Sequence, residues 1–229
     1  MSDAPVFVIT GASTGIGAAT ARRAHEAGHR LVLAARSADT LDALAQELGG
    51  GSDRVIAVPT DVTENDQVEA LIAKASDAFG RVDVVFANAG FGSKPGFEGG
   101  DVDHWRSMVL TNVYGAAITA RAAIPALKAT KGHIVLTGSV AGRIAVPGSL
   151  YSSTKWAVAG MAESLRQEVA EAGVRVTVIE PAKIDTPFFD QQPEIAAEPD
   201  DVARAVLYAV TQPPAVNIDV LRVRSVFQA

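Results

Sequence analysis

Short apolar runs alternate with longer amphipathic segments along nearly the whole chain. The apolar runs, most of them almost continuous in Val, Ile, Leu and Ala, are residues 5–10, 30–35, 54–59, 82–89, 132–139, 174–181 and 217–223. Such runs are typical of parallel strands that are covered on both faces. Helical periodicity marks residues 15–27, 38–48, 65–79, 102–129, 152–172 and 199–211. The alternation predicts an α/β protein, with a doubly wound parallel sheet of about seven strands and helices on both faces.

No repeat, low-complexity tract or linker interrupts this pattern, so residues 1–229 are expected to form a single domain. The longest irregular connection is TPFFDQQPEIAAEP, residues 186–199, which follows the sixth apolar run. In open α/β sheets, ligands bind beyond the carboxyl ends of the strands. Phe188 and Phe189 are adjacent apolar residues in this polar segment, which favours a substrate lid. A surface connection with no such role is the alternative interpretation.

Composition excludes several classes of function. The net charge of −6 argues against nucleic acid or an acidic membrane as the main partner. No run approaches the length of a membrane span, and no basic leader precedes the first strand, so we expect a cytoplasmic protein. The chain has no cysteine. Because the four histidines (His25, His29, His104 and His133) do not cluster in sequence, we expect no metal site and assign them surface or structural positions.

A glycine-rich turn, TGASTGIG at residues 10–17, lies between the first apolar run and the first helical segment. In this context Gly11 permits a tight turn, Gly15 lets the backbone approach a pyrophosphate, and Gly17 lets the helix pack close to the sheet. The N-terminus of that helix would present N–H groups and a positive dipole end to the phosphates. Taken alone, the turn is equally compatible with a structural role.

The segment YSSTK places Tyr151 and Lys155 one helical turn apart on the same face. A phenol has an ordinary pKa near 10, and a neighbouring cation lowers that pKa because it stabilises the phenolate. The pair therefore indicates a tyrosine that transfers a proton. A packing residue beside a surface charge would have the same spacing.

These motifs occur together with others in a defined order. ANAG contains Asn88, TDVT contains Asp61, LTNVYG contains Asn112, and LTGSVAG contains Ser139. With the turn TGxxxGxG and the pair Tyr151 and Lys155, the chain resembles the classical short-chain dehydrogenase/reductase family from Val6 to about Val223. Ala87 departs from the pattern, because the family usually has asparagine there.

The resemblance implies a Rossmann-type fold and an enzyme that transfers hydride between a nicotinamide cofactor and a carbonyl or secondary alcohol. It implies that Tyr151 is the general acid/base, that Lys155 lowers its pKa and binds the nicotinamide ribose, and that Ser139 polarises the substrate oxygen. Asn112 is implied to hold a water that links Lys155 to solvent. The residues implied to bind the cofactor are Gly11, Ser13, Thr14, Gly15, Ile16, Gly17, Arg36, Asp61, Val62, Asn88, Ala89, Gly90, Tyr151, Lys155, Pro181, Ile184 and Thr186.

The end of the second apolar run bears on the choice of cofactor. An acidic residue there would bind the adenosine ribose of NAD, but this chain has Ala35 followed by Arg36. A guanidinium can pair with the 2′-phosphate of NADP. NADP(H) is therefore favoured over NAD(H), although Thr14 is neutral where many relatives that use NADP have a second basic residue. The alternative is that Arg36 is a solvated helix residue.

Three features bear on the substrate. The family usually has PGxxxT after the sixth strand, but here EPAKIDT places Ala182 in the position of glycine, which predicts a smaller cavity near the nicotinamide. The stretch QPPAVNIDVLRVRSVFQ is similar to the branch of the family that oxidises small 3-hydroxy acids and serine-like compounds. Arg143 and Lys183 lie where they could bind a substrate carboxylate, or they are solvated charges.

Two other classes of function are open to this fold. The alternative to the enzyme is a non-catalytic NADP(H)-binding sensor, which would need none of Asn112, Ser139, Tyr151 and Lys155. Lyases, epimerases and isomerases of this type generally carry a substrate subdomain for which this chain has no room.

Members of the family are usually homotetramers or homodimers. The small residues and apolar surplus on residues 152–172 favour such an assembly.

Overall fold

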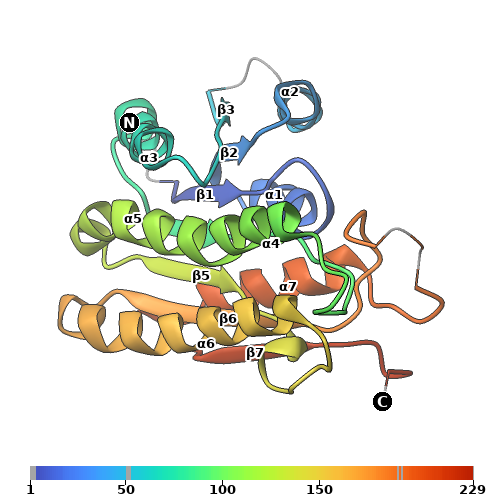
Figure 1. Cartoon of the computed structure of the whole chain (residues 1–229). Helices are drawn as coiled ribbons and strands as arrows, with labels where there is room; N and C mark the ends of the chain where they lie inside the picture. Colours follow the sequence, from blue (N-terminus) through green and yellow to red (C-terminus); the bar gives the residue numbers. More distant parts are fainter. Residues whose placement is uncertain (1–3, 50–52, 190, 192, 229) are drawn as a thin grey trace.

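The computed structural model describes residues 4–49, 53–189, 191 and 193–228. Seven parallel strands form one sheet in the order β3-β2-β1-β4-β5-β6-β7 (Figure 1). The strands are β1 (Val6–Thr10), β2 (Arg30–Ala35), β3 (Val55–Pro59), β4 (Val84–Ala87), β5 (His133–Thr137), β6 (Arg175–Pro181) and β7 (Val220–Val223). The strand order changes direction between β1 and β4, which is the point where open sheets of this kind bind nucleotides.

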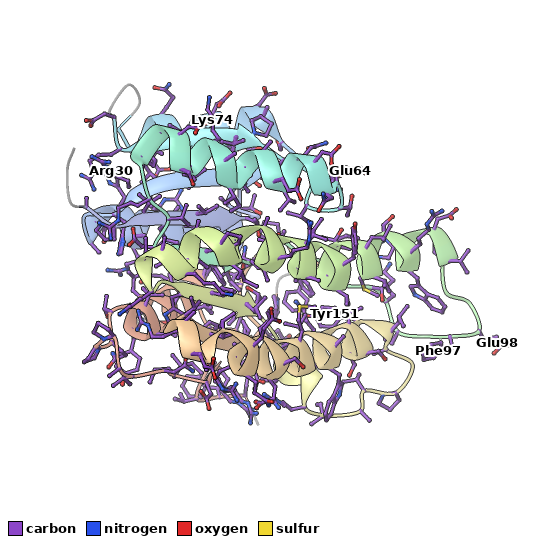
Figure 2. All side chains as sticks on the ribbon, turned by 90° about the vertical axis from the view of Figure 1, so that its left-hand side faces the viewer. Arg30, Glu64, Lys74, Phe97, Glu98 and Tyr151 are labelled. Atoms are coloured by element: carbon purple, nitrogen blue, oxygen red, sulfur yellow. The ribbon has the colours of Figure 1, made fainter. Side chains whose placement is uncertain are left out.

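Helices cover both faces of the sheet (Figure 1). They are α1 (Gly15–Glu26), α2 (Ala38–Glu47), α3 (Asn65–Phe79), α4 (Val102–Val109), the π-helical turn η1 (Leu110–Gly115), α5 (Ala116–Thr130), the 3₁₀ turn η2 (Val140–Gly142), α6 (Leu150–Val169), the 3₁₀ turn η3 (Ala170–Ala172) and α7 (Pro199–Val210). Figure 2 views the face that α3, α5 and α6 cover, and α1, α2 and α7 cover the other. No helix among the described residues combines the length and apolar content needed to cross a membrane.

The core consists of two apolar layers, one on each side of the sheet. Along β1, Val6 and Val8 pack on the side of α3, α5 and α6, whereas Phe7 and Ile9 pack on the side of α1, α2 and α7. All four side chains are fully buried. Because each such side chain contributes about 1.5–3 kcal/mol on burial, the two faces of β1 fix its position at the centre of the sheet.

The structure confirms the predicted fold class and shifts several predicted boundaries. The last strand begins at Val220 rather than at residue 217. The side chain of Asn217 forms hydrogen bonds with the backbone N–H and carbonyl oxygen of Val176, in place of strand pairing there. The helix predicted from residue 152 begins at Leu150, since Ser149 caps it by accepting a hydrogen bond from the N–H of Ser152 at 3.1 Å.

One predicted helix is wrong in its details. Residues 102–129 do not form one regular α-helix, because the π-helical turn η1 separates α4 from α5. Gly115 packs within this turn against Val62, where a Cβ would lie 2.9 Å from Val62 Cγ2. π turns inside α-helices are frequently found at functional sites.

Candidate active site

Two adjoining cavities lie at the carboxyl ends of the strands. The smaller, of about 670 Å³, is lined by the glycine turn after β1 and by residues that follow β2 to β6. The larger, of about 1330 Å³, is lined by residues that follow β4, β5, β6 and β7. Tyr151, His104 and Phe188 line both cavities. Figure 2 labels Tyr151 between the ribbons of α5 and α6, with Phe97 and Glu98 at the tip of a projecting loop. Molecules bound in the two cavities would meet at Tyr151.

The glycine turn has a shape suited to a dinucleotide phosphate. Gly11 and Gly15 have φ angles of 62° and 54°, in the left-handed region that favours glycine. A Cβ on Gly17 would lie 2.1 Å from the carbonyl oxygen of Gly11, so α1 can approach the turn only with glycine there. Thr14 makes no side-chain cap to α1, and the first turn of the helix holds no acidic residue. Its N–H groups are therefore available to an anion, and Ser13, Thr14 and Ile16 line the smaller cavity beside the glycines.

Asn88 fastens the turn to the neighbouring strands. Its Nδ2 donates to the carbonyl oxygens of Thr10 and Gly11 at 3.1 and 3.2 Å, and its Oδ1 accepts from the Thr137 hydroxyl at 3.0 Å. The amide thereby ties the ends of β1, β4 and β5 together. Ala89 and Gly90, the next residues along the chain, line the smaller cavity.

The residues predicted to bind the adenosine half lie together in the smaller cavity. Arg36 follows β2, is exposed, and has no side-chain hydrogen bond or ion pair among the described residues. Asp61 Oδ1 accepts from the N–H and hydroxyl of Thr63 at 2.9 and 2.8 Å, and Val62 is buried beside it. Within the described part of the chain, Arg36 is thus an unpaired cation directly after Ala35, the position where an NAD site would have a carboxylate.

The segment after β6 borders both cavities. Pro181 and Thr186 line the smaller one, and the Thr186 methyl group would lie 3.1 Å from a Cβ on Gly15. Ile184 is buried and bridges to Ala197. Ala182 lines both cavities, and its φ is outside the left-handed region, so the backbone accepts the methyl group that replaces glycine. The predicted narrowing at Ala182 stays a prediction.

Tyr151 and Lys155 lie at the junction of the two cavities, in the first half of α6. Lys155 is 4% exposed, and its Nζ donates to the carbonyl oxygen of Thr137 at 2.7 Å. The same Nζ lies 5.6 Å from the centroid of the Tyr151 ring. Gly90 borders this ammonium closely, since a Cβ there would lie 3.6 Å from Nζ.

The pKa values in this pair differ from the expected ones. Burial raises the pKa of Tyr151 to about 12, while its hydrogen bond with Ser139 has a smaller, lowering effect. Burial lowers the pKa of Lys155 to about 8. The pKa of Tyr151 is therefore set mainly by its withdrawal from water. The predicted lowering of this pKa by Lys155 stays a prediction.

Ser139 is buried at the end of β5. Its Oγ accepts from the N–H of Ala141 at 3.1 Å and contacts the carbonyl oxygen of Pro181 at 3.4 Å. Ser139 lines the larger cavity together with Tyr151, whose pKa it lowers slightly. A substrate oxygen at this point would meet both hydroxyl groups.

Asn112 lies in η1 and connects the loop after β4 to α6. Its Nδ2 donates to the Phe91 carbonyl at 2.9 Å and to the Thr154 hydroxyl at 3.1 Å, and its Oδ1 accepts from the Phe91 N–H at 3.0 Å. The side chain therefore positions the loop beside Gly90 and Lys155. The predicted water relay through Asn112 stays a prediction.

The predicted lid reaches Tyr151. The rings of Phe188 and Tyr151 meet edge to face with centroids 5.5 Å apart, and Phe189 stacks in the same manner on Phe188 at 5.0 Å. The stems of the segment are held by Gln228, whose Nε2 donates to the carbonyl oxygens of Lys183 and Ile195 at 3.0 and 2.9 Å. Positions 190 and 192 of the predicted lid lie outside the described residues.

Sequence reasoning missed several residues of the site. His104 lines both cavities, with its Nε2 2.9 Å from the Gly92 carbonyl oxygen. Arg143, a candidate for binding a carboxylate, is paired with Glu180, which was not singled out. Arg222 pairs with the same carboxylate, whereas Lys183 is exposed at the edge of the larger cavity. These residues are far apart in sequence and come together only in the folded protein, so the sequence alone does not place them in the site.

Comparisons with known proteins agree with this geometry. Residues 5–196 match the family described as short chain dehydrogenase. An uncharacterized oxidoreductase of Staphylococcus aureus is 39% identical over 226 residues, which cover 96% of this chain and 97% of the relative. The chain belongs to the short-chain dehydrogenase family, and it is an oxidoreductase that binds a nicotinamide nucleotide.

Two solved structures are similar over nearly the full length. An alcohol dehydrogenase from the archaeon Thermococcus sibiricus, complexed with 5-hydroxy-NADP, has a TM-score of 0.92 and 34% identity, and 99% of each chain is covered. A serine dehydrogenase from Escherichia coli has a TM-score of 0.87 and 30% identity, covering 98% of this chain and 99% of the other.

Proposed function

We propose that this oxidoreductase transfers hydride between NADP(H) and a small carbonyl or secondary alcohol, with Tyr151 as the general acid/base. The observation that carries the proposal is the position of Tyr151, which lines both the nucleotide-shaped cavity and the larger cavity. The bound cofactor supplies the hydride chemistry, and the protein supplies the proton and the orientation. The phosphates of the cofactor would be held by the N-terminus of α1 and by Gly11, Gly15 and Gly17.

The proton step follows from the environment of the phenol. With its pKa raised to about 12, Tyr151 is protonated at neutral pH and can donate to a carbonyl oxygen during reduction. In the oxidation direction it accepts the proton of the alcohol. The buried Lys155 ammonium stabilises the phenolate that forms, and the Ser139 hydroxyl can donate a hydrogen bond to the substrate oxygen.

The choice of NADP(H) rests on Arg36. Its exposed guanidinium lines the smaller cavity without an ion-pair partner among the residues described, and Ala35 offers no carboxylate to a ribose. The 5-hydroxy-NADP in the similar alcohol dehydrogenase supports the same choice. We expect Arg36→Ala to raise the KM for NADPH about tenfold or more and to leave the KM for NADH nearly unchanged, because only NADPH loses a charge-assisted phosphate contact. Equal effects on both cofactors would contradict this assignment.

The proposed function also includes a substrate pair, an assembly and a cellular location. The two similar structures are an alcohol dehydrogenase and a serine dehydrogenase. Their names support a hydroxyl-bearing compound and its carbonyl product as the substrate pair. We place the enzyme in the cytoplasm as a homotetramer or homodimer, acting without nucleic acid or a membrane as its partner.

A panel of carbonyl compounds and alcohols, followed by absorbance at 340 nm with NADPH and with NADH, tests the proposed function. Turnover of at least one small compound with NADPH is the expected result. Arg121→Met is a matched control, because Arg121 pairs with Glu69 on the surface and lines neither cavity. Tight NADPH binding without turnover of any compound would contradict the proposal and favour a nucleotide sensor.

A further inference from the structure

The larger cavity has a basic lining in a chain whose net charge is −6. Among the described residues, the charged side chains that line it, apart from Asp101, are Lys94, Arg143, Lys183, Arg222 and Arg224. Asp101 serves as the N-cap of α4, where its Oδ1 accepts from the N–H groups of Asp103 and His104 at 3.0 and 3.1 Å. A cavity lined by one sign of charge concentrates ligands of the opposite sign.

Two of these arginines are fixed by one buried carboxylate. Glu180 is 1% exposed, and its Oε1 accepts from Arg143 Nε, while its Oε2 accepts from Arg222 Nη2 at 3.0 Å and from Arg222 Nε at 3.2 Å. Glu180 and Arg222 are register partners in β6 and β7, and Arg143 follows η2. The cluster therefore contains two positive charges and one negative charge.

Both guanidinium groups keep donors that Glu180 does not use. A guanidinium has five N–H donors in a planar fork. Arg143 uses Nε for Glu180, and no acceptor among the described residues is bonded to its two Nη groups. The side chains of Arg143 and Arg222 are 38% and 45% exposed, and both line the cavity. Because Glu180 already fixes the orientation of both guanidinium groups, little side-chain entropy is lost when the carboxylate of a bound molecule pairs with them.

We propose that the Arg143–Glu180–Arg222 cluster binds a carboxylate of the substrate. The preferred substrate is then a carbonyl or hydroxyl compound that carries a carboxylate a few carbons from the reacting carbon. Tyr151 and Ser139 line the same cavity and meet the reacting oxygen, whereas the cluster holds the other end of the molecule. This proposal rests on the proposed function for the reaction, but the binding of the carboxylate can be measured without turnover.

The first arm compares acids with their neutral esters. Acetoacetate, levulinate and 5-oxohexanoate are reduced with NADPH in parallel with their methyl esters, which keep the reacting ketone and remove the charge. We expect at least one acid to exceed its ester about tenfold in kcat/KM, and the chain length that does so reports the distance to the cluster. Arg143→Met and Arg222→Met should bring this ratio close to one by raising KM for the acid. Arg121→Met should leave it unchanged.

The second arm measures binding alone. Trp105 lines the larger cavity and Trp156 does not, so the fluorescence of a Trp156→Phe variant reports on the cavity through Trp105. Pentanoate should change this signal at concentrations about tenfold lower than pentanamide, which has nearly the same shape and no charge. If no ketone is turned over at all, the proposed function fails, and this arm still decides the carboxylate site.

Removal of one arginine leaves Glu180 with one partner, which can destabilise the fold. The Arg143→Lys variant reduces this risk, because it keeps a positive charge beside Glu180 while it loses the planar guanidinium group. It should bind pentanoate less well than the parent. Equal preference for acids and esters in the parent, together with equal binding of pentanoate and pentanamide, would overturn the proposal. So would variants that weaken acids and esters alike, since a purely structural cluster predicts that result.

Discussion

At the scale of single residues, the site depends on two ionisable groups that are withdrawn from water. Tyr151 is kept protonated by burial, and Lys155 holds its proton less tightly than a solvated lysine does. The sequence predicts the pair from its spacing, but it does not predict the balance of the two effects. That balance depends on burial by parts of the chain that are distant in sequence, such as Phe188, whose ring contacts Tyr151.

The burial of Lys155 has a consequence for stability. Its pKa is about 8 in the folded protein, below the ordinary value of 10.5 for a solvated lysine, so the unfolded chain binds the proton more tightly. The free energy of unfolding should therefore rise with pH across this window and fall as pH drops towards about 8. The full effect is about 3 kcal/mol, of which about 2 kcal/mol develops between pH 7 and pH 9.5.

Urea denaturation of the parent and of Lys155→Met at several pH values between about 7 and 9.5 measures this effect. The unfolding free energy of the parent should rise with pH relative to that of the variant, which has no titrating group at this position. Tyr151 acts in the opposite direction only above about pH 10, because its pKa is raised. A difference between the two proteins that stays constant with pH would show that Lys155 is not buried as the structure describes.

At the scale of elements, the regular strands and helices were predictable, and the irregular turns that shape the site were not. The apolar runs predict strands because both faces of the sheet are covered, and this pattern is local in sequence. The π turn η1 is not local, because it is associated with the contacts of Gly115 with Val62 and of Asn112 with Phe91. Helical periodicity alone cannot distinguish it from a regular turn.

The lid gives a prediction at this scale. Replacing Phe188 and Phe189 by Ala removes the ring that contacts Tyr151 and the ring that supports it. We expect the substrate KM to rise about tenfold or more, since an apolar side chain that is buried on binding contributes about 1.5–3 kcal/mol. The binary Kd for NADPH should change little. The lid proposal fails if both kcat and the substrate KM match those of the parent.

At the scale of the whole molecule, charge is distributed in a way that composition conceals. The chain is acidic, yet its larger cavity is basic, because β6 and β7 bring Glu180 beside Arg222 and the segment after η2 adds Arg143. The sequence could place Arg143 near the site by its distance from Ser139. It could not pair Arg143 with Glu180, because the register of β6 and β7 is a property of the folded sheet.

Assembly is also a property of the whole molecule. Tyr114 and Trp156 are 43% and 49% exposed on the helices of one face, and Gly160 has open space where a Cβ would lie. By contrast, Val158 is buried in the chain's own core, so only part of the predicted apolar surplus on α6 is available. The exposed part favours pairing with a second subunit.

Light scattering behind size exclusion at micromolar concentration measures the assembly. We expect a mass of four chains or of two chains, with the tetramer favoured. Trp156→Glu should reduce the mass, because it places a charge on the exposed apolar surface. A mass near the 23.7 kDa of one chain would contradict the prediction.

In the proposed function, the Tyr151 hydroxyl transfers the proton that accompanies hydride transfer. The direct measurement is single-turnover reduction of the best substrate of the panel by the parent and by Tyr151→Phe, with the binary Kd for NADPH measured in parallel. We expect the rate constant of the variant to fall by about 10²-fold or more while the Kd stays within about threefold, because the ring is retained and only the proton is lost. A variant that reduces the substrate at nearly the parent rate would contradict it.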